Sequence, residues 1–400
     1  MSRFHAFDAQ PMPTDPAAVT TPPRTLALPL ALAASLALVG ALVSGGSCAN
    51  DPGKRRSRPI GDAGSPLPAI PSEHHAAGPL PDPRALPAFD ARSGTPIGWS
   101  ALIARVAASD AVLIGEIHGH PLGGAVSVAL LGDLLAGPAP GEAPPGGTVA
   151  LSLEFFGRDH QPNVDDYLAG LTDEPAFRRA TGRDDDPTIG AGNYPPAHRE
   201  MLEASRAAGS PVIAANAPRR YVTLARKGGL DRLESLTDEQ RRLIAIPGAL
   251  TDGPYRDRFF DDMATMIGEH MPDVGYVAPG EGDPADAEAR QRNLDRAAYS
   301  MIKGYYRSQN IWDATMAESV ARALDRGLAP VVHVVGQFHT DHDGGLTQRL
   351  RALRPGAAIL TISLADDTPA QITPESAATI REEDRTRADI IIYVGSPEDW

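Results

Sequence analysis

The chain has 400 residues, 42% of them hydrophobic, and a formal net charge of −14 at pH 7. This length and apolar content are sufficient for a large folded core. Nucleic-acid binding depends on clustered cations that neutralise phosphates, so an acidic chain without a block of Lys and Arg argues against such a surface. We therefore expect no nucleic acid, and small ligands or protein partners instead.

The N-terminal part contains an apolar run at 26–43, without any charge, followed by small residues and Cys48. This pattern is typical of an export signal, so we assign a leader to residues 1–47. A retained membrane span is the alternative, because such a run is just long enough to cross a bilayer. Cys48 is the only cysteine and resembles the lipid-modified cysteine of bacterial lipoproteins. We expect an exported, membrane-anchored lipoprotein of a bacterial cell envelope.

Residues 48–88 are dense in Pro, Gly and Ser and predict a disordered tether, which leaves 89–400 as the folded domain. In this domain, short runs rich in Val, Ile and Leu are typical of strands that are buried on both faces. The predicted strands are 111–114, 148–153, 211–215, 331–335, 357–363 and 389–394.

Helical patterns at 124–136, 196–208 and 344–353 separate several of these strands. The alternation predicts an α/β fold with a mixed, mostly parallel sheet flanked by helices. A helical insertion at about 217–328 would lie over the carboxyl edge of the sheet, where it could close a pocket. Its expected helices are 238–246, 255–270, 285–306 and 309–326, with a loop at 271–284.

Two predicted strands end in the same pattern, glycine followed by two residues and histidine. They lead to His118 after Gly115 and to His339 after Gly336. In an open α/β sheet, ligands bind at the carboxyl ends of the strands, so we expect the two histidines to share one site. Glu116 precedes His118 by two residues, and in an extended backbone both side chains point the same way.

Two further charged residues follow neighbouring strand predictions. Glu154 ends an otherwise apolar run, where an acid is costly to bury unless it is paired or bound to a cation. A surface position at the strand end is the alternative. Arg219 follows the next strand, and its guanidinium could hold a carboxylate ligand or pair with Glu154. His333 lies inside an apolar run, and we expect it to be a core histidine.

Tyr305 and Tyr306 lie on a predicted helix of the insertion. Aromatic residues at helical spacing are most often packing residues. A tyrosine over the pocket could also ligate haem iron.

In these motifs the sequence resembles the haem-binding uptake family called ChaN, in the superfamily that includes Tiki, TraB and erythromycin-esterase-type proteins. The resemblance covers roughly residues 90–400. Its motifs are Gly115-Glu116-Ile117-His118, Leu153-Glu154-Phe155-Phe156 with Gln161, Ala215-Asn216-Ala217-Pro218-Arg219, QNIWDATMA from Gln309, and GQFHTDHDGG from Gly336.

The resemblance implies an exported, often lipid-anchored protein with a mixed α/β core, a helical insertion and haem binding connected with iron acquisition. More distant members of the superfamily with paired motifs of this kind are metal-dependent peptidases or hydrolases. By motif match, the residues of such a site would be Glu116, His118, Glu154 and His339.

Three hypotheses follow. In the first, the chain binds haem, with Tyr305, Tyr306 or His339 as axial ligand and Arg219 near a propionate; whether a second subunit of a homodimer completes the pocket stays open. In the second, the strand-end groups form a metal-dependent hydrolase. Its catalytic residues would be Glu116, His118, Glu154, Arg219 and His339, with His118, Glu154 and His339 as ligands of a divalent metal ion. In the third, the chain is a non-catalytic scaffold.

Overall fold

The computed structural model describes residues 79–137, 147–183, 194–270, 284–366 and 380–396. The expected leader, the expected tether up to residue 78 and nearly all of the expected loop at 271–284 lie outside these residues. Among the described residues, no helix has both the length and the apolar character needed to cross a membrane.

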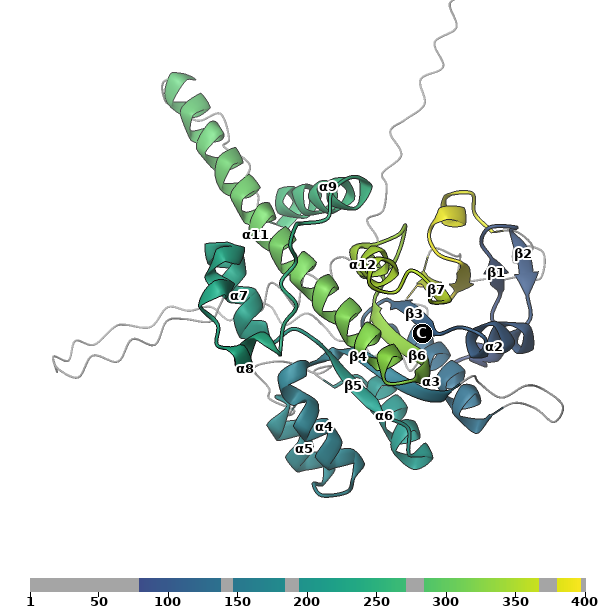
Figure 1. The fold of residues 1–400 in the computed structure, drawn as a ribbon. Coiled ribbons are helices and arrows are strands. Elements are labelled where there is room, and N and C mark those ends of the chain that lie inside the picture. Colours follow the sequence, from purple (N-terminus) through teal and green to yellow (C-terminus); the bar gives the residue numbers. More distant parts are fainter. Residues whose placement is uncertain (1–78, 138–146, 184–193, 271–283, 367–379, 397–400) are drawn as a thin grey trace, which may run out of the picture.

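One eight-stranded sheet organises the fold, in the order β2-β1-β8-β7-β3-β6-β4-β5 (Figure 1). The strands are β1 Ala88–Asp90, β2 Thr95–Ile97, β3 Ala111–Glu116, β4 Thr148–Gly157, β5 Val212–Asn216, β6 Leu328–Gly336, β7 Ile359–Ala365 and β8 Ile390–Tyr393. Strands β3 to β8 run parallel to one another, while β1 is antiparallel to both β8 and β2. The structure confirms the mixed, mostly parallel sheet and all six predicted strands, and it adds β1 and β2.

The central strands are mostly apolar because helices cover both faces of the sheet. In β3 every residue is buried. Val112 and Ile114 pack into the cluster on one face, whereas Ala111 and Leu113 pack into the cluster on the other. This alternation follows from the two-residue period of a strand.

Five helices, including the predicted helix 196–208, contribute to the first of these clusters. They are α2 Trp99–Ala107, α3 Pro121–Ala136, α4 Gln161–Leu168, α5 Glu174–Ala180 and α6 Pro196–Ala208. Figure 1 shows α3 and α6 close to the sheet, with α4 and α5 beyond the edge that β5 forms. The first of the three predicted helices is longer than expected, since it begins at Pro121, and α2, α4 and α5 were not predicted.

The opposite face is covered by α11 Pro284–Asp325 and α12 Gly345–Leu353. Met316, Ala317 and Val320 of α11 pack against the sheet. The prediction of two helices at 285–306 and 309–326 was wrong. They form one helix of 42 residues, because no Gly or Pro interrupts the chain between them.

The insertion between β5 and β6 also contains α7 Arg219–Gly228, α8 Asp238–Arg241 and α9 Pro254–His270. Figure 1 shows α9 beside the half of α11 that extends away from the sheet. The predicted helix 238–246 was too long. The chain leaves the helix early and docks on α11, where the Ala245 backbone N–H donates to the Thr315 hydroxyl over 3.1 Å. Short 3-10 turns complete the described structure: η1 Pro83–Ala85, η2 Arg158–His160, η3 Leu230–Ser235, η4 Gln337–His339 and η6 Glu383–Thr386.

Candidate functional site

The carboxyl ends of β3, β6 and β4 bring the two histidines to one glutamate. Strands β3 and β6 are paired up to Glu116 and Gly336. His118 Nε2 lies 3.9 Å from Glu154 Oε2, and His339 Nε2 lies 3.5 Å from Glu154 Oε1. The structure therefore brings Glu116, His118, Glu154 and His339 together, and we call these residues with Asp313 the strand-end cluster.

Both motif glycines lie where a side chain would displace the cluster. A Cβ on Gly336 would lie 2.8 Å from His118 Nε2, and a Cβ on Gly115 would lie 2.7 Å from Thr340 Oγ1. Real Cβ atoms are essentially never found this close to another heavy atom. The backbone N–H of Gly336 also donates to Glu154 Oε2 over 2.8 Å. The glycines thus allow the two strand ends and Glu154 to approach closely.

Each histidine of the cluster has its Nδ1 within hydrogen-bonding distance of its own carboxylate. His118 Nδ1 lies 2.9 Å from Glu116 Oε1, and His339 Nδ1 lies 2.6 Å from Asp313 Oδ1. Asp313 comes from α11 and is fully buried. A carboxylate on Nδ1 fixes the orientation of an imidazole and leaves Nε2 for the other partner. In both histidines, Nε2 is the atom that faces Glu154.

The mutual attraction of these groups determines their ionisation. Burial opposes the charged form of Glu154, but His339 and His118 outweigh it and lower the pKa of Glu154 to about 2. Burial likewise opposes the charge on His339, but Glu154 and Asp313 raise its pKa to about 10. Glu116 and His118 shift in the same directions, with the pKa of Glu116 well below and that of His118 above its ordinary value. At neutral pH His339 is therefore an imidazolium ion among carboxylates, and the same carboxylates favour the protonated form of His118.

Two members of this network were not found from the sequence. His198 of α6 places Nε2 3.0 Å from Glu116 Oε1, and Tyr255 of α9 donates its hydroxyl to Asp313 Oδ2 over 2.8 Å. Neither follows a strand, so the strand-end argument could not find them. The available signal for His198 was a histidine on the buried face of the well-predicted helix 196–208.

Of the two predicted haem-ligand tyrosines, Tyr306 belongs to a second, largely apolar cluster between α9 and α11, and Tyr305 packs against it. We call it the aromatic cluster; its rings are Tyr255, Phe259, Phe260, Tyr306 and Phe338. Tyr306 is buried and donates its hydroxyl to the Thr251 carbonyl over 2.5 Å. Tyr305 is half-buried, with the guanidinium of Arg226 4.9 Å from its ring centre.

The aromatic cluster adjoins the strand-end cluster. Phe338 precedes His339, and its ring lies 5.4 Å from that of Tyr255. Tyr255 in turn reaches Asp313, the carboxylate behind His339. A ligand on the aromatic cluster would therefore lie close to the buried charges.

Arg219 occupies a different position from the one we expected for a partner of Glu154. It is the first residue of α7 and is exposed. Among the described residues it makes no ion pair with Glu154, whose partners are the two histidines and the Gly336 backbone. His333 is fully buried, lies 2.9 Å from the Ser152 hydroxyl through Nδ1, and has its pKa lowered to about 4 by burial. It is a core histidine, as expected.

We predicted that His118, Glu154 and His339 are ligands of a divalent metal ion. Their side chains face one another, but within the described ranges no group of three or more His, Cys, Asp or Glu residues is arranged to hold a metal ion. Cys48 lies outside the described residues.

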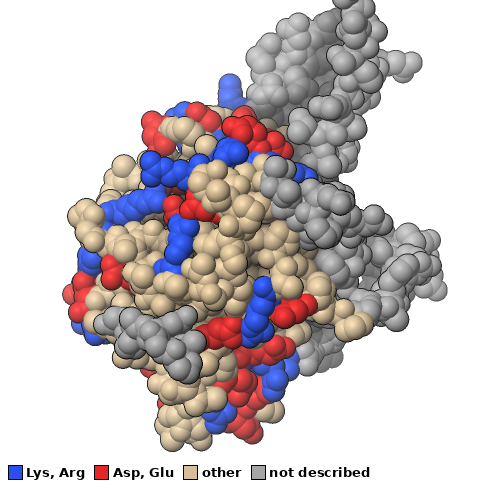
Figure 2. Space-filling view, turned by 90° about the vertical axis from the view of Figure 1, so that its right-hand side faces the viewer, with Lys and Arg blue, Asp and Glu red and all other residues tan. Residues whose placement is uncertain are grey.

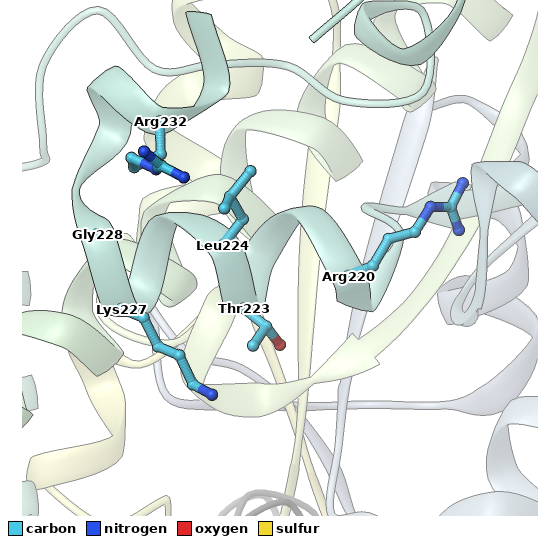
Figure 3. A pocket seen from close by; sticks show the side chains of 6 residues that line it. All are labelled: Arg220, Thr223, Leu224, Lys227, Gly228 and Arg232. Atoms are coloured by element: carbon cyan, nitrogen blue, oxygen red, sulfur yellow. The ribbon is translucent and has the colours of Figure 1, made fainter. Parts of the chain in front are cut away.

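A shallow pocket of about 440 Å³ lies along α7, away from the strand-end cluster (Figure 3). Its charged side chains are Arg220, Lys227 and Arg232. Figure 3 shows Arg220 and Lys227 extending from the helix in different directions. These cations do not converge on one point, so the pocket does not supply a site.

Comparison with known proteins gives one family match, to the family described as haem-binding uptake, Tiki superfamily, ChaN, over residues 102–350. Among solved structures, the chain is similar to ChaN of Campylobacter jejuni, described as binding haem cofacially. The TM-score is 0.52 at 15% identity, over 78% of this chain and 98% of that one. At this identity the likeness shows the shared fold.

Two other solved structures are similar at lower scores. A protein from Bacillus cereus gives a TM-score of 0.39 at 13% identity, over 74% of this chain and 90% of that one. The type III effector HopBA1 gives 0.35 at 13% identity, over 74% of this chain and 92% of that one. No curated protein matches the chain significantly.

Proposed function

The chain belongs to the ChaN family of haem-binding uptake proteins in the Tiki superfamily, and from this membership we propose that it binds haem as a surface lipoprotein in haem or iron uptake. The observation that carries the proposal is the family match over residues 102–350. This range contains β3 to β6, α11, the strand-end cluster and the aromatic cluster.

The aromatic cluster fits a porphyrin in its chemistry. Phe259, Phe260 and Phe338 supply ring surfaces, and Met266 and Met301 pack against them. Aromatic and methionine side chains are suited to a flat apolar ligand because they offer large, adaptable contact areas. Haem iron, when bound, supplies a metal centre that takes an axial ligand from the protein.

We propose that one of Tyr305, Tyr306 and His339 is the axial ligand of the haem iron. Tyr305 is the most accessible of the three, because Tyr306 is buried with its hydroxyl on Thr251 and His339 is buried between Asp313 and Glu154. Tyr299 is a further phenol on the same helix. It is 55% exposed, and its ring lies 5.9 Å from that of Phe260.

The propionates of haem require cations at the rim of the site. Arg219 is exposed and makes no ion pair among the described residues, so its guanidinium is available to a carboxylate. A homodimer in which a second subunit completes the apolar site remains part of this proposal.

The test is a visible-absorption titration of the full-length chain in mild detergent with haemin, against a detergent-only blank. We expect a saturable Soret shift that Tyr305→Phe weakens at least ten-fold. Tyr306→Phe and Tyr299→Phe are measured in parallel. Tyr167→Phe is the control, because Tyr167 packs on the other face of the sheet. Absence of a saturable shift would overturn haem binding, and an equal response of all variants would overturn the tyrosine ligand.

The lipoprotein part of the proposal rests on Cys48 after the apolar run 26–43. We propose a thioether-linked lipid on Cys48 that anchors the chain to a bacterial membrane. In cells, Cys48→Ser should abolish incorporation of labelled fatty acid while leaving synthesis of the chain unchanged. Labelling that survives this substitution would contradict the anchor.

Hydrolase activity is the second candidate function. It is favoured by the two histidines that face Glu154, each of which contacts a carboxylate through Nδ1. His118 is the accessible member, since its side chain is 29% exposed while that of His339 is 7% exposed. The raised pKa of His118 favours its protonated form, which suits the role of a general acid. Arg219 would stabilise an oxyanion in this proposal.

The hydrolase candidate is tested with ester and peptide substrates on the full-length chain, alongside elemental analysis. Activity that His118→Ala removes would support it. A stoichiometric divalent ion lost in the His118→Ala, His339→Ala double variant would support the metal form. Absence of turnover on all substrates, together with haem binding, would reject this candidate.

A further inference from the structure

A second, polar pocket lies between β1, β7, α12 and η6. It has a volume of about 430 Å³. Five arginines and three aspartates line it, and three acids outside the lining pair with Arg385 and Arg387. The arginines are Arg92, Arg105, Arg351, Arg385 and Arg387. Figure 2 shows the side of the molecule that carries β1 and β2, where basic and acidic side chains are interspersed.

The aspartates of this arginine pocket are already occupied by protein groups. Asp389 accepts hydrogen bonds from the backbone and the hydroxyl of Thr361, both over 2.9 Å. Asp90 lies 2.6 Å from Arg105, and Asp343 lies 2.5 Å from Arg351. A guanidinium carries five N–H donors, so these single contacts leave the arginines with donors for a ligand.

Two of the arginines are held in fixed positions. Arg387 lies 3.1 Å from Asp384, which is fully buried, and 3.7 Å from Asp341. The guanidinium of Arg385 lies against Gly94, where a Cβ would be 2.7 Å from Nη1 and 2.8 Å from Nη2. Donors that are fixed before a ligand arrives lose less conformational entropy on binding.

Arg92 supplies a further positive charge to the pocket. It is exposed and makes no ion pair among the described residues. Threonine hydroxyls complete the lining, although most of them already donate to protein groups; they are Thr340, Thr347, Thr361 and Thr386. The ligand-facing donors are therefore the guanidinium groups, which come from several segments of the chain.

A strained loop joins this pocket to the strand-end cluster. His342 and Asp343 have φ angles of +52° and +56°, in the left-handed region that residues other than glycine rarely adopt. Asp343 lines the pocket, and the His342 backbone N–H donates to the Arg387 carbonyl over 2.7 Å. Such strain persists only where surrounding contacts enforce it, and it is common at binding sites.

We propose that the arginine pocket binds the phosphate group of a small phosphorylated ligand. A phosphate offers more acceptor oxygens than a carboxylate and matches donors that converge from several sides. The volume exceeds that of a bare phosphate and is in the range of small-molecule sites. Most of the lining residues lie outside 102–350, so the site is independent of the family match and of haem binding.

The test uses isothermal titration of the full-length chain with pyrophosphate, inorganic phosphate and citrate at one fixed, low ionic strength. We expect pyrophosphate to bind at one site per chain, more tightly than citrate. Arg92→Gln and Arg351→Gln should each weaken it at least five-fold. Neither variant removes a buried group, since the Arg351 side chain is 47% exposed.

Arg199→Gln is the matched control. The Arg199 side chain is 48% exposed and pairs with Glu174 over 2.6 Å, but it lies on α6. Loss of pyrophosphate binding in this control to the same extent would show a general charge effect and overturn the site. Tighter binding of citrate, or no saturable heat with pyrophosphate, would overturn the phosphate assignment. Haemin titrations of the same variants should be unchanged, which separates this inference from the haem proposal.

Discussion

His339 and Glu154 stabilise each other through charges that neither would carry alone in the interior. The pKa of His339 is raised from 6.5 to about 10, so its contribution to stability is complete below pH 6.5 and is lost as the pH rises through 10. The pKa of Glu154 is lowered from 4.5 to about 2, so its contribution is complete above pH 4.5 and is lost as the pH falls through 2. Together they stabilise the fold most between about pH 4.5 and 6.5.

The first prediction concerns this pH window. His339→Gln should lower the free energy of unfolding at pH 6 by roughly 3 kcal/mol, because it leaves buried Asp313 without its cation and Glu154 with His118 alone. Urea denaturation of the wild type should also show a decline in stability between pH 7 and pH 10 that the variant lacks. Equal slopes for both proteins would mean that His339 is not charged in the folded state.

The second prediction concerns the contact between the two motifs. Gly336→Ala would place a Cβ 2.8 Å from His118 Nε2, although the backbone at this residue allows alanine. We expect the His118 ring to move away from Glu154, its pKa to fall, and stability to drop by about 1–3 kcal/mol. NMR titration of the imidazole measures the pKa. Gly98→Ala is the control, because a Cβ there has open space.

At the scale of elements, the strand-end cluster depends on the packing of α12 against α11. Gly345 begins α12, and a Cβ there would lie 2.2 Å from Asp313 Oδ2 and 2.6 Å from Tyr255 Cε1. The start of one helix thus touches the carboxylate that orients His339. The position of α12 is therefore part of the site, although none of its side chains belongs to the strand-end cluster.

The third prediction follows from this contact. Gly345→Ala should destabilise the protein by roughly 1–3 kcal/mol through overpacking and should lower the pKa of His339 as Asp313 is displaced. Gly132→Ala on α3 is a matched helical control with open space for the Cβ, and it should leave stability unchanged or raise it by up to about 1 kcal/mol. Thermal denaturation distinguishes the two. A loss in the control as large as that in Gly345→Ala would contradict the packing argument.

The sequence predicted those secondary-structure elements whose own residues show a clear pattern of burial. Runs of Val, Ile and Leu identified β3 to β8 because both faces of these strands are buried. The hairpin of β1 and β2 was not predicted, because each strand has only three residues and β2 is largely exposed. The strand-end argument predicted that His118, Glu154 and His339 lie together. The contact of His198 with Glu116 depends on how α6 packs against the sheet, and the local sequence does not specify this packing.

At the scale of the whole molecule, α11 connects two regions with different environments. Its later part packs on the sheet through Met316 and Val320 and on α7 through Ile311, and all three side chains are fully buried. Its earlier part extends from the body beside α9, where Tyr299 is exposed. Amide exchange depends on local opening, which is rare in a packed core and frequent in a helix with few buried contacts.

The fourth prediction is that amides at 311–321 exchange at least 100-fold more slowly than those at 296–303 in the full-length chain, as measured by mass spectrometry. Haem bound on the aromatic cluster would add buried contacts to the extending part of α11, so haemin should slow exchange at 299–306 and leave 311–321 unchanged. Protection that appears only on α2 or β1 would place the ligand elsewhere. Because pyrophosphate is expected at the arginine pocket, it should protect α12 and η6 instead, and the two ligands should give separable patterns in one protein.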